Sequence, residues 1–311
     1  MKRKGNLYDD ICQLDNIRNV IDEVCRNTKN KNKVNKFKEY RAIHTYKIYH
    51  TLINRAYQVG PYHIFTIYEP KKRRIVSQNM FDKVVNHLVA RFILLPSLNS
   101  SLLETNVASR EGKGTQAGLK YYYHYRRICK QRYGRYYILK CDVKKFFASI
   151  DHDILKEKLK RKIKDKEALK IVFDIIDSET EGLGIGNMTS QILAIFYLND
   201  LDHYIKEKLK IKYYVRYQDD FVLFHESKEY LKECLTKIKE YLEKEKLKLN
   251  KKTRIYSDNN NFVYLGRDKF GRYARSRFIK RKLKKRWYLY QNGEIALHSY
   301  ISSVKSYKVF T

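Results

Sequence analysis

Cysteines are few and scattered in this chain, which argues against two kinds of protein. The five are odd in number, and none has the spacing of a zinc site. They predict reduced thiols in a cytoplasmic protein and speak against a secreted, disulfide-stapled one. The cysteines are Cys12, Cys25, Cys129, Cys141 and Cys234.

Long apolar runs are also missing. No run approaches the roughly 18 residues that a membrane-spanning helix needs. The basic N-terminus leads into Asp9 and Asp10 without the apolar stretch of a signal peptide. No internal repeat and no long flexible linker divides the chain. We therefore expect a cytoplasmic protein without a membrane partner, of about two domains.

Acidic residues are heavily outnumbered. The 34 Asp and Glu stand against 66 Lys and Arg, so the net charge is +32. Many of the 28 tyrosines are interleaved with basic residues, as in residues 121–127, and rings beside cations suit stacking on bases and contact with phosphates. Nucleic acid is thus the expected partner. A membrane surface, a ribosomal role and an AT-rich codon bias are the alternative explanations.

The most informative motif that the chain does contain is the adjacent carboxylate pair Asp219 and Asp220, within Tyr-Gln-Asp-Asp. Two runs rich in aromatic and β-branched residues flank it, 213–215 and 221–224, and they predict the strands of a hairpin. Adjacent carboxylates repel each other, and a divalent cation compensates that repulsion. Taken alone, the pair favours an ordinary turn, because Asp is common in turns.

A third carboxylate, Asp142, follows another predicted strand, residues 136–141. Alone it is most simply a cap or turn residue. On a strand beside the hairpin it would complete a two-metal site, which clamps the attacking and leaving oxygens of a phosphoryl transfer.

Three of the twelve glycines lie within residues 182–186, ahead of a helix-like apolar pattern. Such a loop can approach a phosphate or a base closely, and a plain turn with Thr189 or Ser190 as helix N-cap is the alternative. The apolar pattern consists of Ile192, Ile195, Leu198, Leu201, Ile205 and Leu209.

Other segments have simpler predictions. Residues 1–60 are expected to be helical, with the basic run 29–38 as a solvated loop and an RNA contact as the alternative for that run. Helices are predicted over 82–94, ended by Pro96, and near 152–178. An amphipathic helix is predicted from Lys228 to Lys248, with Leu231, Leu235, Ile238 and Leu242 as its buried stripe.

Taken in order, these motifs resemble the reverse transcriptase family over most of the chain. Residues 65–75 and 109–115 look like the first two fingers motifs of that family, and residues 262–266 look like its primer-grip hairpin. The resemblance implies an α+β, right-hand polymerase fold with fingers, a ferredoxin-like palm of antiparallel sheet and helices, and a small helical thumb. The implied domains are 1–135, N-terminal helices and fingers; 136–266, palm; and 267–311, thumb.

The implied thumb is strongly basic. Residues 267–286 hold eleven Lys or Arg, which would hold the phosphates of a duplex and make binding depend on salt.

The glycine loop indicates a subgroup. Ile185 precedes Gly186, and Gln191 follows Ser190, a form that resembles bacterial and phage reverse transcriptases of the group II intron-like branch, most closely those of diversity-generating retroelements. Those enzymes copy a template RNA with errors opposite adenine. Ile185 replaces a polar side chain that would brace the incoming nucleotide, and losing such a brace weakens discrimination between right and wrong pairs.

Two departures keep the subgroup open. Ala148 stands where many relatives have Pro, and Gln218 where many have Met or Ala. Phage-defence-associated and intron-type reverse transcriptases, including template-independent synthesis, therefore stay as alternatives. We do not expect a maturase or nuclease extension in 311 residues without Cys-x-x-Cys pairs.

The resemblance also implies which residues form the active site. Asp142, Asp219 and Asp220 would be catalytic and would hold two Mg²⁺ ions, with Mn²⁺ as a substitute, and Val143 would add a backbone carbonyl. Asp142 and Asp219 are the expected direct ligands, with Asp220 binding weakly or tuning the site. A non-enzymatic RNA-binding protein with this fold is the competing class, and the three intact carboxylates argue against it.

The remaining implied roles concern the nucleotide. Phe147 would be a steric gate that excludes a 2′-hydroxyl and selects dNTPs, with core packing as the alternative. The expected triphosphate contacts are Lys72, Arg73, Arg74 and Arg110, with an exposed hairpin as the alternative for residues 71–74. Ile185, Gly186 and Gln191 would shape the pocket of the base pair. The implied partners are template RNA, the cDNA/RNA duplex, dNTPs and a small basic accessory protein.

Overall fold

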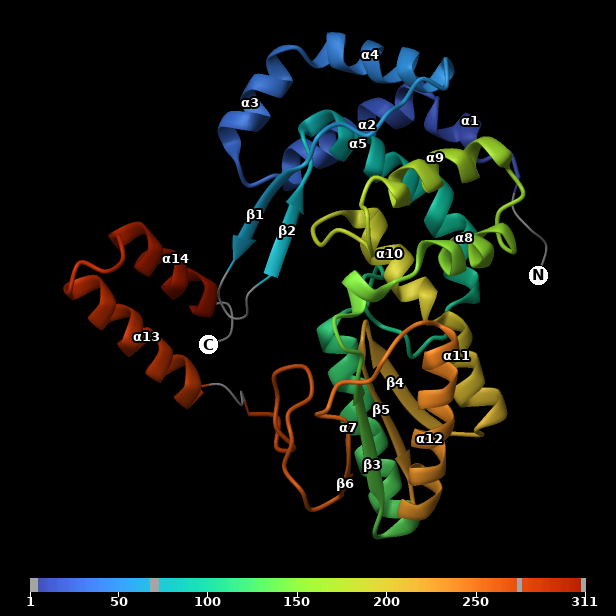
Figure 1. The fold of residues 1–311 in the computed structure, drawn as a ribbon, viewed down its shortest axis with the longest axis vertical. Helices are drawn as coiled ribbons and strands as arrows, with labels where there is room; N and C mark the ends of the chain where they lie inside the picture. The colour runs from blue at the N-terminus through green and yellow to red at the C-terminus, as the bar shows by residue number, and fades with distance from the viewer. Residues whose placement is uncertain (1–4, 68–72, 273–275, 309–311) are drawn as a thin grey trace.

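The computed structural model describes residues 5–67, 73–272 and 276–308 (Figure 1). Helices pack around a four-stranded antiparallel sheet, with a separate two-stranded sheet between the N-terminal helices and the C-terminal helix pair. The fold is thus mixed α+β, as predicted. No helix within these ranges has the length and apolar character needed to cross a membrane.

The N-terminal part is helical, as predicted for residues 1–60. The helices are α1 (Tyr8–Ile11), α2 (Leu14–Asn27), α3 (Lys31–Glu39) and α4 (Arg41–Ile53). The prediction of a loop for the basic run 29–38 was wrong. The Asn30 side chain caps α3 by accepting a hydrogen bond from Lys33 N–H, and Val34 and Phe37 give this helix a buried face.

The next segment begins with the two-stranded sheet of β1 (His63–Ile67) and β2 (Arg73–Ser77). A continuous helical path follows, formed by α5 (Met80–Leu88), the π-helix η1 (Val89–Leu94), α6 (Leu95–Leu98) and the 3₁₀ turn η2 (Asn99–Ser101). The prediction that Pro96 ends this path was wrong. Leu95 N–H bonds back to Ala90 O in the wider π turn, and Pro96 lies in the first turn of α6, where a missing N–H is tolerated.

The segment that follows contains α7 (Thr115–Tyr133), β3 (Tyr137–Asp142), the 3₁₀ turn η3 (Phe146–Ser149), α8 (His152–Lys160) and α9 (Lys166–Asp177). The single helix predicted near 152–178 is therefore two helices. The break has a local cause, because the Asp165 carboxylate caps α9 at Ala168 N–H and also accepts hydrogen bonds from the backbone N–H groups of Leu7 and Tyr8.

The second half of the chain alternates helices and strands. The elements are α10 (Met188–Tyr197), α11 (Asn199–His203), the π-helix η4 (Tyr204–Lys208), β4 (Tyr213–Tyr217), β5 (Asp220–His225), α12 (Lys228–Lys244), β6 (Arg254–Ser257), α13 (Ser276–Gln291) and α14 (Leu297–Lys308). The N-cap of α10 is Asn187, so the alternative caps Thr189 and Ser190 were wrong. All six apolar positions predicted along this helical path are buried.

One other boundary differs from the prediction. Helix α12 ends at Lys244, because the chain turns through a left-handed Lys246 and Leu247 is buried. The hairpin predicted at residues 262–266 is present as a tight antiparallel turn. Tyr264 and Arg267 exchange backbone hydrogen bonds at 3.0 Å, and Leu265 and Gly266 lie between them at positive φ.

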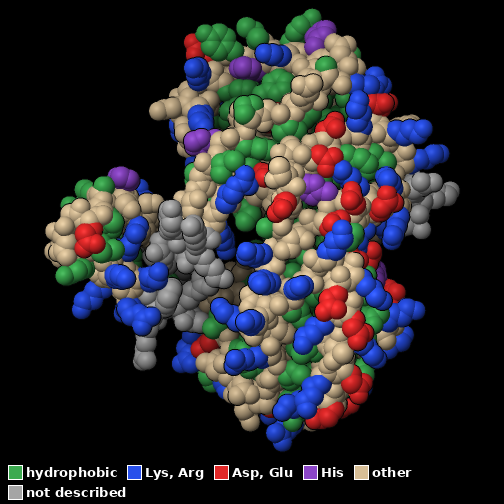
Figure 2. All heavy atoms as spheres, in the orientation of Figure 1, with side chains coloured by type: hydrophobic (Ala, Val, Ile, Leu, Met, Phe, Trp, Pro, Cys, Tyr) green, Lys and Arg blue, Asp and Glu red, His purple; other side chains and the backbone are tan. Residues whose placement is uncertain are grey.

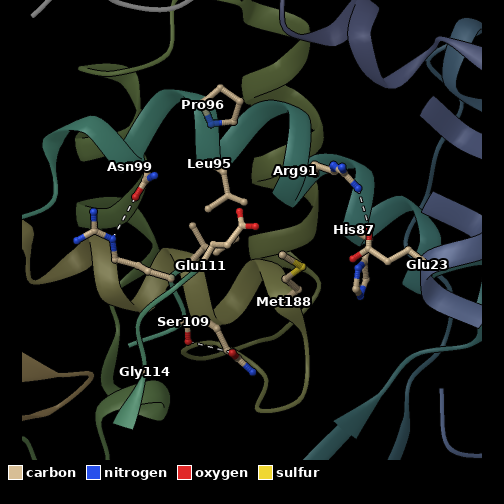
Figure 3. Close-up of a pocket in the computed structure, with 13 residues that line it drawn as sticks. Glu23, His87, Arg91, Leu95, Pro96, Asn99, Ser109, Glu111, Gly114 and Met188 are labelled. Atoms are coloured by element: carbon tan, nitrogen blue, oxygen red, sulfur yellow. Dashed lines mark hydrogen bonds and ion pairs between the residues drawn. The ribbon is translucent and has the colours of Figure 1, made fainter. Parts of the chain in front are cut away.

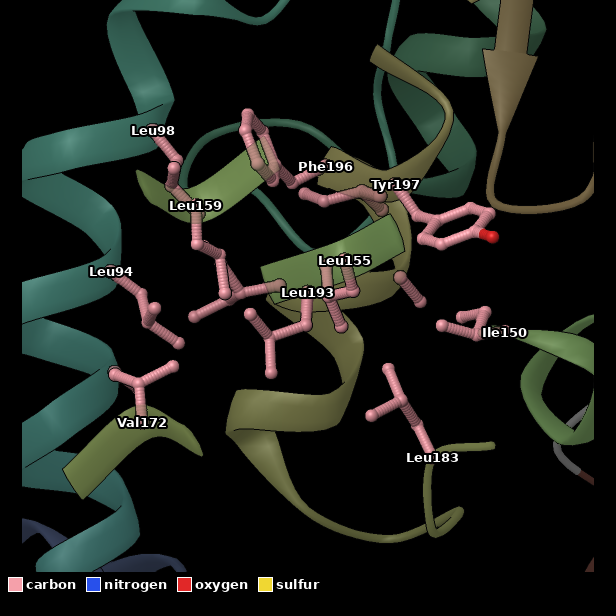
Figure 4. Packing of buried hydrophobic residues seen from close by; sticks show 14 of the residues in the cluster. Leu94, Leu98, Ile150, Leu155, Leu159, Val172, Leu183, Leu193, Phe196 and Tyr197 are labelled. Atoms are coloured by element: carbon pink, nitrogen blue, oxygen red, sulfur yellow. The ribbon is translucent and has the colours of Figure 1, made fainter. Parts of the chain in front are cut away.

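The main sheet has the strand order β4-β5-β3-β6, and each neighbouring pair is antiparallel. Each of its faces is covered by apolar packing. Leu139 and Phe221 lie on the face packed by α10 and α12, while Ile138 and Val222 lie on the face packed by α7. The cluster that contains Leu139 and Phe221 continues beyond the end of the sheet, where side chains such as Leu98, Leu159 and Leu193 join α6, α8, α9 and α10 (Figure 4).

A buried ion pair fixes the position of the β4–β5 hairpin. Arg216 and Asp202 have fully buried side chains, and Arg216 Nε and Nη2 each lie 2.6 Å from an Asp202 carboxylate oxygen. Arg216 also donates to Ile195 O and to Gln218 O, both at 2.9 Å. One guanidinium therefore joins α10, α11 and the tip of the hairpin.

We expect Arg216→Met to lower the free energy of unfolding by about 3 kcal/mol, since it leaves Asp202 buried without its counter-charge. Chemical denaturation measures this. The matched control is Arg18→Met, which removes the exposed partner of Asp15 and should cost less than about 1 kcal/mol. Equal effects of the two substitutions would contradict the structural role of the buried pair.

Candidate active site

The register of the sheet brings the three predicted carboxylates to one end. Asp142 is directly opposite Asp220 in the β3–β5 pairing, and Tyr217 is opposite Asp220 across the β4–β5 turn. Gln218, at φ 55°, and Asp219 form that turn. Val143 N–H donates to Asp219 O at 3.1 Å, so the end of β3 is tied to the tip of the hairpin.

Asp220 already has a cationic partner. Its Oδ1 forms an ion pair with Lys140 Nζ, and that ammonium also lies 5.7 Å from the centre of the Tyr264 ring. Burial raises the pKa of Asp220 to about 6; Lys140 opposes the rise, and the nearby Asp142 and Asp219 carboxylates add to it. The negative charges at this end of the sheet therefore act on one another.

The donor chemistry of this end fits a hard divalent cation. Carboxylate and carbonyl oxygens are the ligands that Mg²⁺ prefers, and Asp142, Asp219 and the Val143 carbonyl offer them. Within the described ranges, no three His, Cys, Asp or Glu side chains converge closely enough to form a three-ligand site. The carboxylate of Asp220 is engaged by Lys140 instead.

The glycines of residues 182–186 allow close packing of protein on protein. The loop joins the edge of β2, since Val76 N–H donates to Ile185 O at 3.0 Å. Gly186 has φ 135°, and a Cβ there would lie 2.7 Å from Val76 O; a Cβ on Gly182 would collide with the backbone of Phe147. In the structure these glycines approach neighbouring backbone, where the sequence suggested a phosphate or a base.

Phe147 is held beside this loop. Its carbonyl accepts a hydrogen bond from Leu183 N–H at 2.8 Å, and its half-buried ring meets Phe146 edge-on at 5.8 Å between centroids. The ring packs on the core and keeps an exposed part, and its role as a steric gate stays a prediction.

A chain of amide and hydroxyl groups links the hairpin tip to α10. Gln218 Nε2 donates to Ser109 Oγ, and Ser109 Oγ donates to Gln191 Oε1, each at 3.0 Å. The exposed Gln191 side chain lines a cavity of about 840 Å³ together with residues of α2, α5, η1 and the 109–114 segment (Figure 3). The segment that resembles a fingers motif therefore contacts both the hairpin and the helix after the glycine loop.

Arg110, one of the predicted triphosphate contacts, is engaged by backbone and side-chain groups of the protein. Arg110 Nη1 donates to Leu103 O and Asn106 O, at 2.7 and 2.9 Å, and Arg110 Nε donates to Asn99 Oδ1 at 3.1 Å. The Arg110 guanidinium therefore holds the backbone of residues 103–106 in place.

Two other cations of this set, Arg73 and Arg74, lie on β2. Arg73 is exposed on β2, and Arg74 forms an ion pair with Glu179 at 3.0 Å. Lys72 lies outside the described residues. The contact of Arg74 places β2 beside the segment that leads into the glycine loop.

Several residues of the site were missed from the sequence. Lys140 could have been found, because strand alternation puts it on the same face as Asp142. The Arg216–Asp202 pair and the ring of Tyr264 reach the site only through tertiary packing, for which the sequence carries no local signal.

Known proteins resemble this chain in sequence and in fold. The family described as reverse transcriptase (RNA-dependent DNA polymerase) matches residues 61–268. Telomerase from Candida albicans, solved with the TWJ fragment of telomeric RNA, is 16% identical, with a TM-score of 0.53; the match covers 68% of this chain and 44% of that one. Apo telomerase from Candida tropicalis, truncated from its C-terminal domain, is also 16% identical, with a TM-score of 0.52 and coverage of 67% and 52%.

These matches differ in what they establish. The chain spans about half the length of the telomerases, and at 16% identity they show a shared fold alone. No curated protein matches the sequence. The family match spans well over half of the 311 residues and includes Asp142, Asp219 and Asp220. The chain belongs to the reverse transcriptase family of RNA-directed DNA polymerases.

Proposed function

We propose that this protein copies a template RNA into DNA, with the phosphoryl transfer taking place at Asp142, Asp219 and Asp220. The main support for the proposal is the pairing of β3 with β5. It sets Asp142, at the end of β3, opposite Asp220, at the start of β5 next to the hairpin turn. Strands hold side chains more rigidly than loops do, and phosphoryl transfer depends on positioning and on charge stabilisation.

The proposed layout follows from this site. Residues 136–266, with the four-stranded sheet, would be the palm; residues 1–135, with β1 and β2, the fingers; and residues 267–311 the thumb. The basic pair α13–α14 supports the last assignment, since its lysines and arginines suit contact with duplex phosphates. In Figure 2, Lys and Arg side chains are spread over the middle and lower parts of the face shown.

Two Mg²⁺ ions, or Mn²⁺ in their place, fit the donors Asp142, Asp219 and the Val143 carbonyl. When bound, they would supply Lewis-acid activation of the primer 3′-hydroxyl and neutralise charge on the leaving pyrophosphate. The residues of the chain do the positioning. The hydrogen bond from Val143 N–H to Asp219 O ties the end of β3 to the β4–β5 turn. Arg216 fixes the same turn by donating a hydrogen bond to Gln218 O.

The nucleotide would lie between this end of the sheet and β2. We assign Phe147 as the sugar gate, and Ile185, Gly186 and Gln191 as the wall around the base pair. Lys72, Arg73, Arg74 and Arg110 are the proposed triphosphate contacts. Arg74 would have to share its guanidinium with Glu179, and Arg110 would act from its braced position beside Ser109.

Within the family, we propose a bacterial or phage enzyme of the group II intron-like branch, in a diversity-generating retroelement. The Ile185-Gly186 and Ser190-Gln191 pairs support this assignment, and with it copying that is error-prone at template adenines, in the cytoplasm and with a small basic accessory protein. A phage-defence-associated or intron-type enzyme, including one that synthesises DNA without a template, is the alternative that Gln218 and Ala148 leave open.

We expect Asp219→Asn to reduce RNA-templated DNA synthesis by at least about 10³-fold while the protein stays folded, because it removes a charged metal donor. Primer extension measures the loss, and circular dichroism verifies the fold. Asp153→Asn, at an exposed position in α8, is the matched control and should keep full activity. Synthesis at the wild-type rate by the Asp219 variant would overturn the site assignment.

We expect Phe147→Ala to raise the use of ribonucleotides relative to deoxyribonucleotides by about tenfold or more, because the ring would no longer exclude the 2′-hydroxyl. Parallel primer extensions with dNTPs and rNTPs give the ratio. Phe173→Ala removes another half-buried ring, on α9 and outside the proposed gate, and should leave the ratio unchanged. Unaltered sugar selection in the Phe147 variant would place the gate elsewhere.

The pH dependence follows from the pKa of Asp220, which burial raises to about 6. Below that pH the carboxyl group takes up a proton and loses the charge that it contributes to the site. Initial rates of DNA synthesis should therefore fall as the pH decreases from about 7 to about 5, while circular dichroism shows a folded protein. A rate that stays constant over this range would show that Asp220 is ionised throughout or that its charge is not needed.

A further inference from the structure

Lys140 is half-buried at the carboxylate end of the sheet. Strand alternation places it on the same face as Asp142, and the β3–β5 register puts Asp220 diagonally across from it. Its Nζ pairs with Asp220 Oδ1, and the two side chains are only 17% and 23% exposed. Most of the lysine is therefore packed inside the protein, next to the proposed cation donors.

The Lys140 ammonium is held from a second direction. It lies 5.7 Å from the centre of the Tyr264 ring, which attracts a cation through its electron-rich face. Tyr264 is fully buried and packs on the Tyr122 ring of α7 at 5.2 Å between centroids. Because its surroundings are fixed, the ring keeps the ammonium in place beside Asp220.

We propose that Lys140 is a positioning residue that acts through Asp220, as a built-in counter-ion that holds this carboxylate back from the divalent cation. The inference deepens the proposed function and rests on its cation site at Asp142 and Asp219. It assigns unequal roles to the three carboxylates: two are the primary oxygen donors, and the charge of the third is shared with a lysine.

Lys140 is expected to lower the affinity of the site for a divalent cation in two ways. Its positive charge would repel a divalent cation held by Asp142 and Asp219, and the half-buried surroundings would weaken that repulsion less than bulk water does. It also competes with the cation for an Asp220 oxygen. Arg216, the buried cation of the hairpin, is neutralised by Asp202, and Lys144 and Lys145 on the chain beyond Val143 are exposed to solvent, where screening weakens their effect.

The test is a titration of the whole protein with Mn²⁺ alone, without nucleic acid or dNTPs, with free Mn²⁺ followed by electron paramagnetic resonance. Lys140→Met should bind Mn²⁺ about tenfold more tightly than the wild type. The matched control is Lys144→Met, which removes the same charge from an exposed position and should change the affinity by less than about threefold. Lys140→Arg keeps the charge and should stay near the wild type.

The outcomes separate this inference from the function on which it rests. If Lys140→Met binds Mn²⁺ no more tightly than Lys144→Met does, the proposed role of Lys140 is overturned, while the proposed cation site is unaffected. If Asp142→Asn does not lower the affinity for Mn²⁺, the cation site itself is overturned. If circular dichroism shows that Lys140→Met does not fold, Lys140→Gln gives the same test, since it keeps a hydrogen-bond donor toward Asp220 without the charge.

Discussion

The arrangement of the site depends on the buried ion pair between Arg216 and Asp202. A guanidinium without contact to water must satisfy its donors inside the protein, and Arg216 does so on Asp202, Ile195 O and Gln218 O. The last of these bonds sets the turn that presents Asp219 and Asp220. The geometry of this half-buried turn therefore depends on a fully buried charge that contacts it.

Near the hairpin tip, one cation lies on each face of the sheet: Arg216 of β4 is fully buried, and Lys140 of β3 is half-buried. Arg216 lies on the face packed by α10 and α12, where Asp202 neutralises it; Lys140 lies on the other face, between Asp220 and the Tyr264 ring. The first cation fixes the backbone of the turn, and the second sets the charge available at its carboxylates. Structure and electrostatics of the site are thus controlled by different residues, which makes their effects separable by substitution.

Much of this could be predicted from the sequence, and the exceptions have physical reasons. The strands around Asp142 and Asp219 follow from their aromatic and β-branched runs, which fit a half-buried pleated surface. The break before α9 was missed because Asp165 receives hydrogen bonds from Leu7 and Tyr8, more than 150 residues away in the chain. Likewise, nothing near Arg216 in the sequence shows that its partner is Asp202, whereas Lys140 follows from strand alternation alone.

The most direct test of the account is primer extension by the purified protein on a defined RNA template, with Mg²⁺ and all four dNTPs, followed by sequencing of the product. The account predicts DNA complementary to the RNA, and errors concentrated opposite template adenines would support the diversity-generating assignment. Evenly scattered errors would keep the polymerase and favour an intron-type or defence-associated enzyme. DNA whose sequence is independent of the template, or no DNA at all, would contradict RNA-directed synthesis.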